Sequence, residues 1–151
     1  RAGQRSAFDG GEMSYILVVE DNPDHRDLIR LVLGRSYRGV PVRMAASGED
    51  ALKLMESEGL PRIALVDVDM PGLSGQATVR RIREGKAGRL LPVIMLSTSD
   101  ESEDVRACLE AGANSYVRKP LALSDWGRTM GAIADYWLLQ HAGAGGTAND
   151  A

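Results

Sequence analysis

Short runs of apolar residues alternate along the chain with longer stretches in which apolar residues recur every three or four positions. The short runs are Tyr15–Val19, Val42–Ala45, Ile63–Val66, Val93–Leu96 and Ser115–Arg118. The first, third and fourth runs are continuously apolar, which is typical of strands buried on both faces. Each run is followed by a stretch with helical spacing, so the pattern predicts five strand–helix units.

Five strand–helix units in succession predict an α/β fold with a parallel sheet and helices on both faces. Right-handed crossovers limit the possible topologies, and five strands favour the flavodoxin-like order 2-1-3-4-5, a (βα)5 three-layer sandwich. Sheets of this kind bind ligands at the carboxyl ends of their strands, beside the point where the strand order reverses. That point lies here between the first and third strands.

The two ends of the chain lack this pattern. Residues 1–12 are Gly- and Ser-rich and aperiodic, and they read as a tag remnant or as a linker from another domain. Residues 142–151 are small and polar, which predicts a flexible tail. We therefore expect a single domain over residues 13–141.

Composition then narrows the possible functions. The chain is 44% hydrophobic and 26% charged, as globular proteins are, and its net charge of −3 predicts no nucleic-acid or membrane-surface binding. No apolar run is long enough to span a membrane. Cys108 is the only cysteine, which excludes an intramolecular disulfide and a multi-cysteine metal site. A cytoplasmic protein is the simplest expectation.

Polar residues follow the apolar runs where ligands are expected to bind. Glu20 and Asp21 follow the first run, Asp67 the third, Ser97 the fourth and Lys119 the fifth. Strands 1 and 3 should be neighbours, about 4.8 Å apart, so three carboxylates should gather at one edge of the sheet. Carboxylates this close repel one another, and a compact site with only oxygen ligands favours Mg²⁺ or Mn²⁺.

A metal ion, a lysine and a hydroxyl around one carboxylate are the groups that an acyl phosphate needs. Asp67 would attack a phosphoryl group in line, and the metal ion and Lys119 would neutralise the oxygens that are transferred. Ser97 would hydrogen-bond a phosphoryl oxygen after the transfer. The pattern therefore predicts a phosphorylation switch centred on Asp67.

Four separated motifs occur in one order: ILVVEDN (16–22), ALVDVDMPGLSG (64–75), PVIMLST (92–98) and AGANSYVRKP (111–120). In spacing and order they resemble the CheY-like response-regulator receiver domains of two-component signalling, over roughly residues 14–140. The resemblance implies that Asp67 is the phosphoacceptor.

By the same resemblance, Glu20 and Asp21 form the acidic pair, of which Asp21 is the more direct metal ligand, and the backbone carbonyl of Asp69 completes the metal site. The resemblance further implies three switch and phosphoryl-binding residues. Ser97 matches the switch hydroxyl, Tyr116 the switch aromatic residue, and Lys119 the lysine that contacts the phosphoryl group. The resemblance also makes the bond between Lys119 and Pro120 a candidate cis peptide, since this bond is usually cis in the family and cis bonds concentrate at proline.

The family's mechanism implies a histidine kinase or phosphotransfer protein as donor. Phosphorylation would then change the face formed by the fourth expected helix (helix 4, around Val105–Leu109), the fifth strand (Ser115–Arg118) and the fifth helix (helix 5, around Trp126–Trp137). A downstream protein would read this face. Such a domain catalyses only its own phosphorylation and dephosphorylation. The segments Ser97–Ser99 and Asp135–Leu138 resemble single-domain regulators paired with phytochrome kinases, which implies a possible role in light signalling and a homodimer through helices 4 and 5.

Each residue also has a plainer explanation. Asp21 could cap a helix, Lys119 could be a solvated surface residue, and Ser97 a satisfied strand-end hydroxyl. The Asp69 side chain could be solvated, or its extra charge could change metal affinity and dephosphorylation. His25 could modulate the site or occupy a solvated helix position.

Three other functions compete. Asp67 and Asp69 resemble the start of haloacid-dehalogenase phosphatases, but Pro71 departs from that motif. A flavin-binding protein of the same topology needs a phosphate loop after strand 1, where Glu20 and Asp21 would repel the phosphate. A degenerate receiver that acts only as an interaction module is disfavoured because Asp21, Asp67 and Lys119 are all intact.

Overall fold

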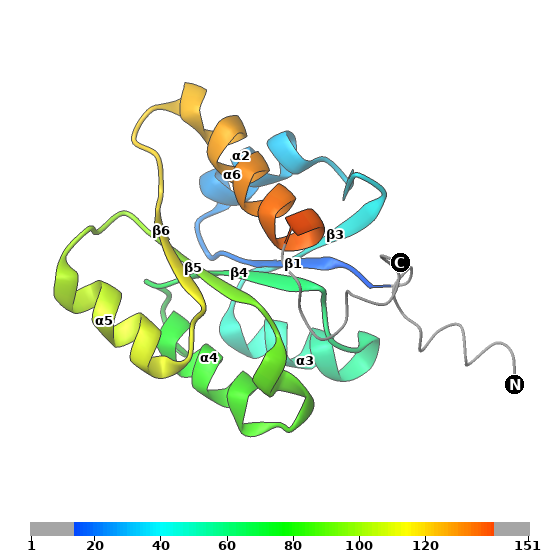
Figure 1. The fold of residues 1–151 in the computed structure, drawn as a ribbon, viewed down its shortest axis with the longest axis vertical. Coiled ribbons are helices and arrows are strands. Elements are labelled where there is room, and N and C mark those ends of the chain that lie inside the picture. Colours follow the sequence, from blue (N-terminus) through cyan, green and yellow to red (C-terminus); the bar gives the residue numbers. More distant parts are fainter. Residues whose placement is uncertain (1–13, 141–151) are drawn as a thin grey trace, which may run out of the picture.

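Residues 14–140 of the computed structural model are described here, and they form three layers (Figure 1). The central layer is a sheet, and helices lie on both of its faces. One face carries α2 (Pro23–Leu33) and α6 (Trp126–Asp135). The other carries α3 (Gly48–Glu58), α4 (Gly75–Glu84) and α5 (Ser102–Ala111). The expectations for residues 1–12 and 142–151 lie outside the described residues.

The sheet has the predicted order. Its parallel strands run β3-β1-β4-β5-β6, which is the order 2-1-3-4-5 when only these five are numbered. Their bounds are Ile16–Val19 for β1, Val40–Ala45 for β3, Ile63–Asp67 for β4, Val93–Ser97 for β5 and Ser115–Arg118 for β6. The predicted flavodoxin-like fold is confirmed, with one addition. A short sixth strand, β2 (Ser36–Tyr37), pairs antiparallel with β3.

The strands divide the core between the two helical layers because successive side chains point to opposite faces of the sheet. In β1, Leu17 and Val19 belong to the cluster that contains residues of α3, α4 and α5, while Ile16 and Val18 belong to the cluster that contains residues of α2 and α6. All four side chains are almost fully buried. Burial on both faces explains why the runs in β1, β4 and β5 are continuously apolar.

A tight turn at Arg38 and Gly39 allows the short strand β2 to pair with β3. Arg38 and Gly39 both have positive φ angles, of 51° and 85°, as a two-residue hairpin turn of type I′ requires. Asp135 at the end of α6 accepts hydrogen bonds from the Tyr37 hydroxyl at 3.0 Å and from Arg38 Nε at 2.9 Å. The hairpin is thereby fastened to the end of α6, and the ion pair with Asp135 holds Arg38 in place.

Residues 14–140 also contain three shorter helical segments: 3₁₀ segments at Ala87–Leu90 and Leu123–Asp125, and a π-helical turn at Tyr136–Gln140 that continues α6. None of the helices in residues 14–140 is long and apolar enough to cross a membrane.

The predicted cis bond before Pro120 is wrong for this structure. Every peptide bond in the described part of the chain is trans, including Lys119–Pro120. A trans bond before proline is favoured by about 0.5–1 kcal/mol unless packing imposes the cis form. The Lys119 amide N–H donates to the Ser97 carbonyl at 2.6 Å, so the pairing of β6 with β5 continues up to the proline with a trans bond.

Arg83 near the end of α4 joins segments that are distant in sequence. Its guanidinium group donates to the carbonyls of Gly88 and Leu91, each at 2.7 Å, to the Gly112 carbonyl at 2.7 and 2.9 Å, and to Asn114 Oδ1 at 2.9 Å. Asn114 Oδ1 also accepts from the Val93 amide at the start of β5. One side chain therefore ties α4 to the loops that precede β5 and β6.

We predict that Arg83→Met lowers the free energy of unfolding by about 2–3 kcal/mol, because several partly buried acceptors lose their donor while the apolar stem is kept. Denaturant titration measures the change. The matched control is Arg81→Met on the same helix. Arg81 is exposed and pairs only with Glu84 at 4.0 Å in the described chain, so its replacement should change the value by less than about 0.5 kcal/mol. Equal losses in both variants would contradict the role of Arg83.

Candidate functional site

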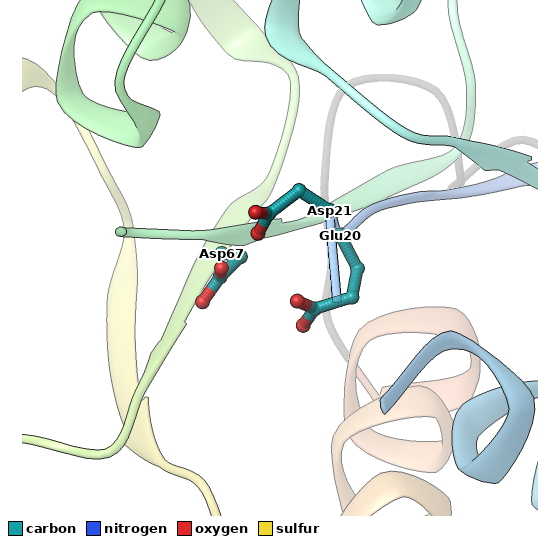
Figure 2. A group of neighbouring side chains, drawn as sticks. All are labelled: Glu20, Asp21 and Asp67. Atoms are coloured by element: carbon teal, nitrogen blue, oxygen red, sulfur yellow. The ribbon is translucent and has the colours of Figure 1, made fainter. Parts of the chain in front are cut away.

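The register between β1 and β4 places Glu20 and Asp67 side by side. Val19 of β1 pairs with Val66 of β4, so the next residue of each strand, Glu20 and Asp67, lies at the same edge of the sheet. Asp21 follows one residue later. One carboxylate oxygen of each of the three residues lies within 4.8 Å of the others, and Figure 2 shows the three side chains gathered at this edge. The predicted clustering of the three carboxylates is confirmed.

The backbone after β1 is fixed by residues other than the acidic pair. Asn22 caps α2, and its side chain accepts from the amides of Asp24 and His25 at 2.8 and 3.2 Å. Arg26 Nη1 donates to the carbonyls of Glu20 and Asp21 at 3.0 and 3.1 Å. Asp21 is therefore not the helix cap, and its carboxylate is left for the acidic cluster.

The backbone beyond Asp67 is held by a close approach of α4. A Cβ atom on Gly75 would lie 2.2 Å from the Asp67 carbonyl oxygen and 2.8 Å from Val68 Cα. Only glycine permits this contact, because both neighbours are backbone atoms. The Gly75 amide donates to the Val68 carbonyl at 3.1 Å, which fixes the turn after β4.

Lys119 reaches the cluster from the end of β6. Its side chain is 4% exposed, and Nζ lies 2.7 Å from Glu20 Oε1 and 2.9 Å from Asp67 Oδ1. Lys119 is therefore not a solvated surface lysine. It is a buried cation between two buried carboxylates, an arrangement in which each charge offsets the desolvation of the other.

The charge on Asp67 is poorly stabilised in spite of this lysine. The pKa of the Asp67 carboxyl is raised to about 7, chiefly by burial and less by the charges of Glu20 and Asp21, while Lys119 acts in the opposite direction. One positive side chain is thus too little for three carboxylates. The site is electrostatically incomplete without a further cation.

A buried oxygen supports the same conclusion. Glu20 is fully buried, and its Oε2 accepts from the Asn22 amide at 3.0 Å. Its Oε1 forms the ion pair with Lys119, yet it has no partner with hydrogen-bond geometry among the described residues. Buried carboxylate oxygens rarely stay in this state, and a divalent cation would satisfy the oxygen. Glu20, Asp21 and Asp67 are hard oxygen donors of the kind that Mg²⁺ and Mn²⁺ prefer.

A cavity of about 230 Å³ opens at the cluster. Its lining consists of polar side chains that follow β1, β4, β5 and β6: Glu20, Asp21, Asn22, His25, Asp67, Asp69, Thr98 and Lys119. The cavity therefore holds the predicted acidic residues and the lysine. The Asp69 side chain is exposed, which agrees with the plainer explanation for it.

Two residues predicted to belong to the site, Ser97 and Tyr116, are not among the described residues that line the cavity. Ser97 is buried, and its hydroxyl oxygen accepts from the Ser99 amide at 3.1 Å. The Tyr116 hydroxyl donates to the Ser99 carbonyl at 2.6 Å. Sequence reasoning missed Thr98, which directly follows the end of β5, and it gave His25 only a minor place.

Comparison with known proteins places this geometry in a family. The sequence profile of the response regulator receiver domain matches residues 16–127. The probable methanogenesis regulatory protein FilR2 of Methanothrix harundinacea is 37% identical over 128 residues, which cover 82% of this chain and 83% of that protein.

Two solved structures are similar in shape. The phosphorylated cyanobacterial phytochrome response regulator RcpA is 26% identical with a TM-score of 0.79, over 87% of this chain and 98% of that one. The Mn²⁺-bound form of response regulator Rcp1 is 26% identical with a TM-score of 0.75, over 85% and 97% of the two chains.

The raised pKa of Asp67 predicts how stability changes with pH in the absence of metal. The folded chain holds the Asp67 proton more tightly than the unfolded chain, so the stabilisation is complete below about pH 4 and is lost as the pH rises through about 7. Relative to Asp67→Asn, the wild-type chain should lose about 2 kcal/mol of unfolding free energy between pH 5 and pH 8. Denaturant titrations in EDTA measure this difference.

Asp27→Asn is the control for this measurement, because it removes an exposed carboxyl group from α2. Its profile should run parallel to that of the wild-type chain. Parallel profiles for wild type and Asp67→Asn would show that burial does not hold the Asp67 proton.

Proposed function

The chain belongs to the response regulator receiver domain family, and on that premise we propose that Asp67 accepts a phosphoryl group from a histidine kinase or phosphotransfer protein. The observation that carries the proposal is the position of the Asp67 carboxylate at the mouth of a polar cavity, 2.9 Å from the Lys119 ammonium and beside Glu20 and Asp21. Receiver domains are signalling domains rather than classical enzymes, so we set aside the phosphatase and flavin alternatives.

In the proposed transfer, a carboxylate oxygen of Asp67 attacks the phosphorus in line with the leaving group. The new bond joins Asp67 Oδ to phosphorus, and the phosphorus–nitrogen bond of a phosphohistidine breaks, with the electron pair staying on the imidazole. Lys119 neutralises negative charge on the phosphoryl oxygens. Hydrolysis reverses the state: water attacks the phosphorus, inorganic phosphate leaves, and the Asp67 carboxylate is restored. The protein would thus catalyse only its own phosphorylation and dephosphorylation.

We propose that Glu20, Asp21 and Asp67 hold a Mg²⁺ or Mn²⁺ ion, together with the backbone carbonyl of Asp69. Receiver domains bind these ions in their acidic pocket, and the similar Rcp1 structure contains Mn²⁺. When bound, the ion supplies positive charge for the phosphoryl oxygens and offsets the repulsion among the carboxylates. The exposed Asp69 side chain adds a negative charge at the rim, and we propose that it tunes metal affinity and the lifetime of the phosphoryl group.

The proposed switch runs through the loop after β5. A phosphoryl group on Asp67 would draw the Ser97 hydroxyl away from the Ser99 amide, to which it is bonded at 3.1 Å. Tyr116 on β6 is bonded to the Ser99 carbonyl, so a shift of this loop would reach Tyr116 directly. The elements that would change are α5, β6 and α6, and the output would be a protein–protein contact made by this face.

The proposals for the phosphoryl donor and for the assembly rest on similarity alone. The likeness to the phytochrome response regulator RcpA supports a phytochrome histidine kinase as donor, and hence a role in light signalling. We further propose that phosphorylation favours a homodimer through α5 and α6, in which Trp137, half-buried near the end of the described chain, would lie close to the contact. A cytoplasmic location is proposed on the basis of the family only.

Phosphorylation is tested with Mg²⁺ and acetyl phosphate, a small donor that releases acetate. We expect intact-mass spectrometry to show one added phosphoryl group on the wild-type chain and none on Asp67→Asn or in EDTA. Asp21→Asn should slow labelling about a hundredfold, because it removes one proposed metal ligand. Asp24→Asn is the matched control, since Asp24 is exposed in the same segment outside the cluster, and it should label normally. A wild-type chain that stays unlabelled would contradict the proposal.

Dimer formation is tested by gel filtration with light scattering, with and without acetyl phosphate. We expect the phosphorylated chain to shift to twice the monomer mass. Leu109→Asp on α5 should abolish the shift, because it places a charge at a 46% exposed leucine of the proposed contact. Leu31→Asp on α2 is the control, since Leu31 is 78% exposed on a helix outside that face. A monomer under both conditions would rule the dimer out.

A further inference from the structure

His25 lies in the first turns of α2 and lines the same cavity as the acidic cluster. Its side chain is 27% exposed. Its Nδ1 lies 3.0 Å from Lys119 Nζ, and its ring packs 5.2 Å from the ring of buried Trp126 at the start of α6. His25 thus connects three separate elements: α2, the end of β6 and α6.

The chemistry of the two groups fixes the direction of this contact. A lysine ammonium has three donors and no acceptor, so His25 Nδ1 must accept, and the ring proton sits on Nε2. The two carboxylates approach Lys119 Nζ as ion pairs, at 2.7 and 2.9 Å. His25 Nδ1 meets Lys119 Nζ with hydrogen-bond geometry, beside these two carboxylates. The position of the ammonium group therefore depends on His25 as well as on charge.

The two carboxylate partners of Lys119, Glu20 and Asp67, are also candidate metal ligands. Glu20 and Asp67 belong to the acidic cluster that suits a divalent cation, and His25 does not. Carboxylates shared with a cation attract the ammonium group less strongly. His25 Nδ1 lies 3.9 Å from Glu20 Oε1 but is not itself a member of the cluster. His25 is thus the one of the three partners of Lys119 that is not also a candidate metal ligand.

We propose that His25 is a positioning residue that holds the Lys119 ammonium in place for phosphoryl transfer to Asp67. The inference rests on the proposed function, because it assigns His25 a part in that same reaction. A lysine that must neutralise phosphoryl oxygens acts only from a narrow range of positions, and small displacements of such a group slow the reaction strongly. A third contact from a helix that also packs on α6 restricts those positions.

The competing explanation is that the His25 ring only fills space against Trp126. Two substitutions separate the two roles. His25→Leu keeps apolar bulk near Trp126 but removes the acceptor. His25→Asn loses the ring but places a side-chain oxygen where Nδ1 now lies. If positioning matters, His25→Asn should be rescued relative to His25→Leu; if packing matters, His25→Asn should be the more impaired variant.

The experiment measures the rate of labelling by acetyl phosphate at saturating Mg²⁺, by intact-mass spectrometry on the full chain. We expect His25→Leu to be slowed about fivefold, the worth of one hydrogen bond, and His25→Asn to stay within about twofold of the wild-type chain. Mg²⁺ affinity, followed by tryptophan fluorescence, should be the same in all three proteins, because His25 is not a proposed ligand. His25→Met replaces His25→Leu if the leucine variant does not fold.

The failures of the two ideas are distinguishable. No labelling of the wild-type chain overturns the proposed function, and the inference falls with it. A labelled wild-type chain with an equal rate in His25→Leu overturns the inference alone. Equal or greater loss in His25→Asn also overturns it, since that result assigns His25 to packing.

Discussion

Three carboxylates at one edge of a sheet need positive charge, and in the described chain Lys119 provides it from the end of β6. The ammonium group lies within 3 Å of two buried carboxylate oxygens, which keeps Glu20 and Asp67 from facing each other without compensation. One cation cannot balance three anions. The raised pKa of Asp67 and the Glu20 Oε1 atom without a hydrogen-bond partner are both consistent with this deficit of positive charge. The deficit supports the proposal that a divalent cation binds here, and the charge of that cation would in turn let a phosphoryl group approach Asp67.

The rest of the fold keeps this unfavourable cluster together. Strand pairing places Glu20 beside Asp67 at the same edge of the sheet. Arg26 donates hydrogen bonds to the two carbonyls that follow β1, and Gly75 allows α4 to pack closely against the backbone of Asp67. These contacts are made by the main chain or to it, so they do not depend on the charge of the carboxylates. The stability needed to hold the cluster comes from the two apolar layers on either side of the sheet, which bury β1, β4 and β5 almost completely.

Much of this arrangement could be predicted from sequence, because buried parallel strands and strand-end polar residues leave strong local signals. The strand order and the clustering of Glu20, Asp21 and Asp67 followed from those signals. The β2 hairpin could not be predicted, because Arg38 is an unusual residue for a positive φ and its partner Asp135 lies 97 residues away. Thr98 directly follows the end of β5, so the strand-end signal could have included it. His25 lies within α2 and was undervalued because only packing places it at the cavity. The cis bond expected at Pro120 came from resemblance, and the proline itself was too weak a local signal to decide between cis and trans.

The contacts of Lys119 also join the site to the face proposed for output. Its amide donates to the Ser97 carbonyl at 2.6 Å, while its ammonium group contacts Asp67, so one residue bonds to both the main chain of β5 and the acidic cluster. Tyr116, three residues earlier on β6, is bonded to Ser99 in the loop after β5. The proposed phosphoryl group on Asp67 would therefore act on two connected strands at once, through the lysine and through the Ser97–Ser99 loop. Because closely packed elements move between discrete arrangements rather than deforming continuously, such paired contacts favour a two-state response over a graded one.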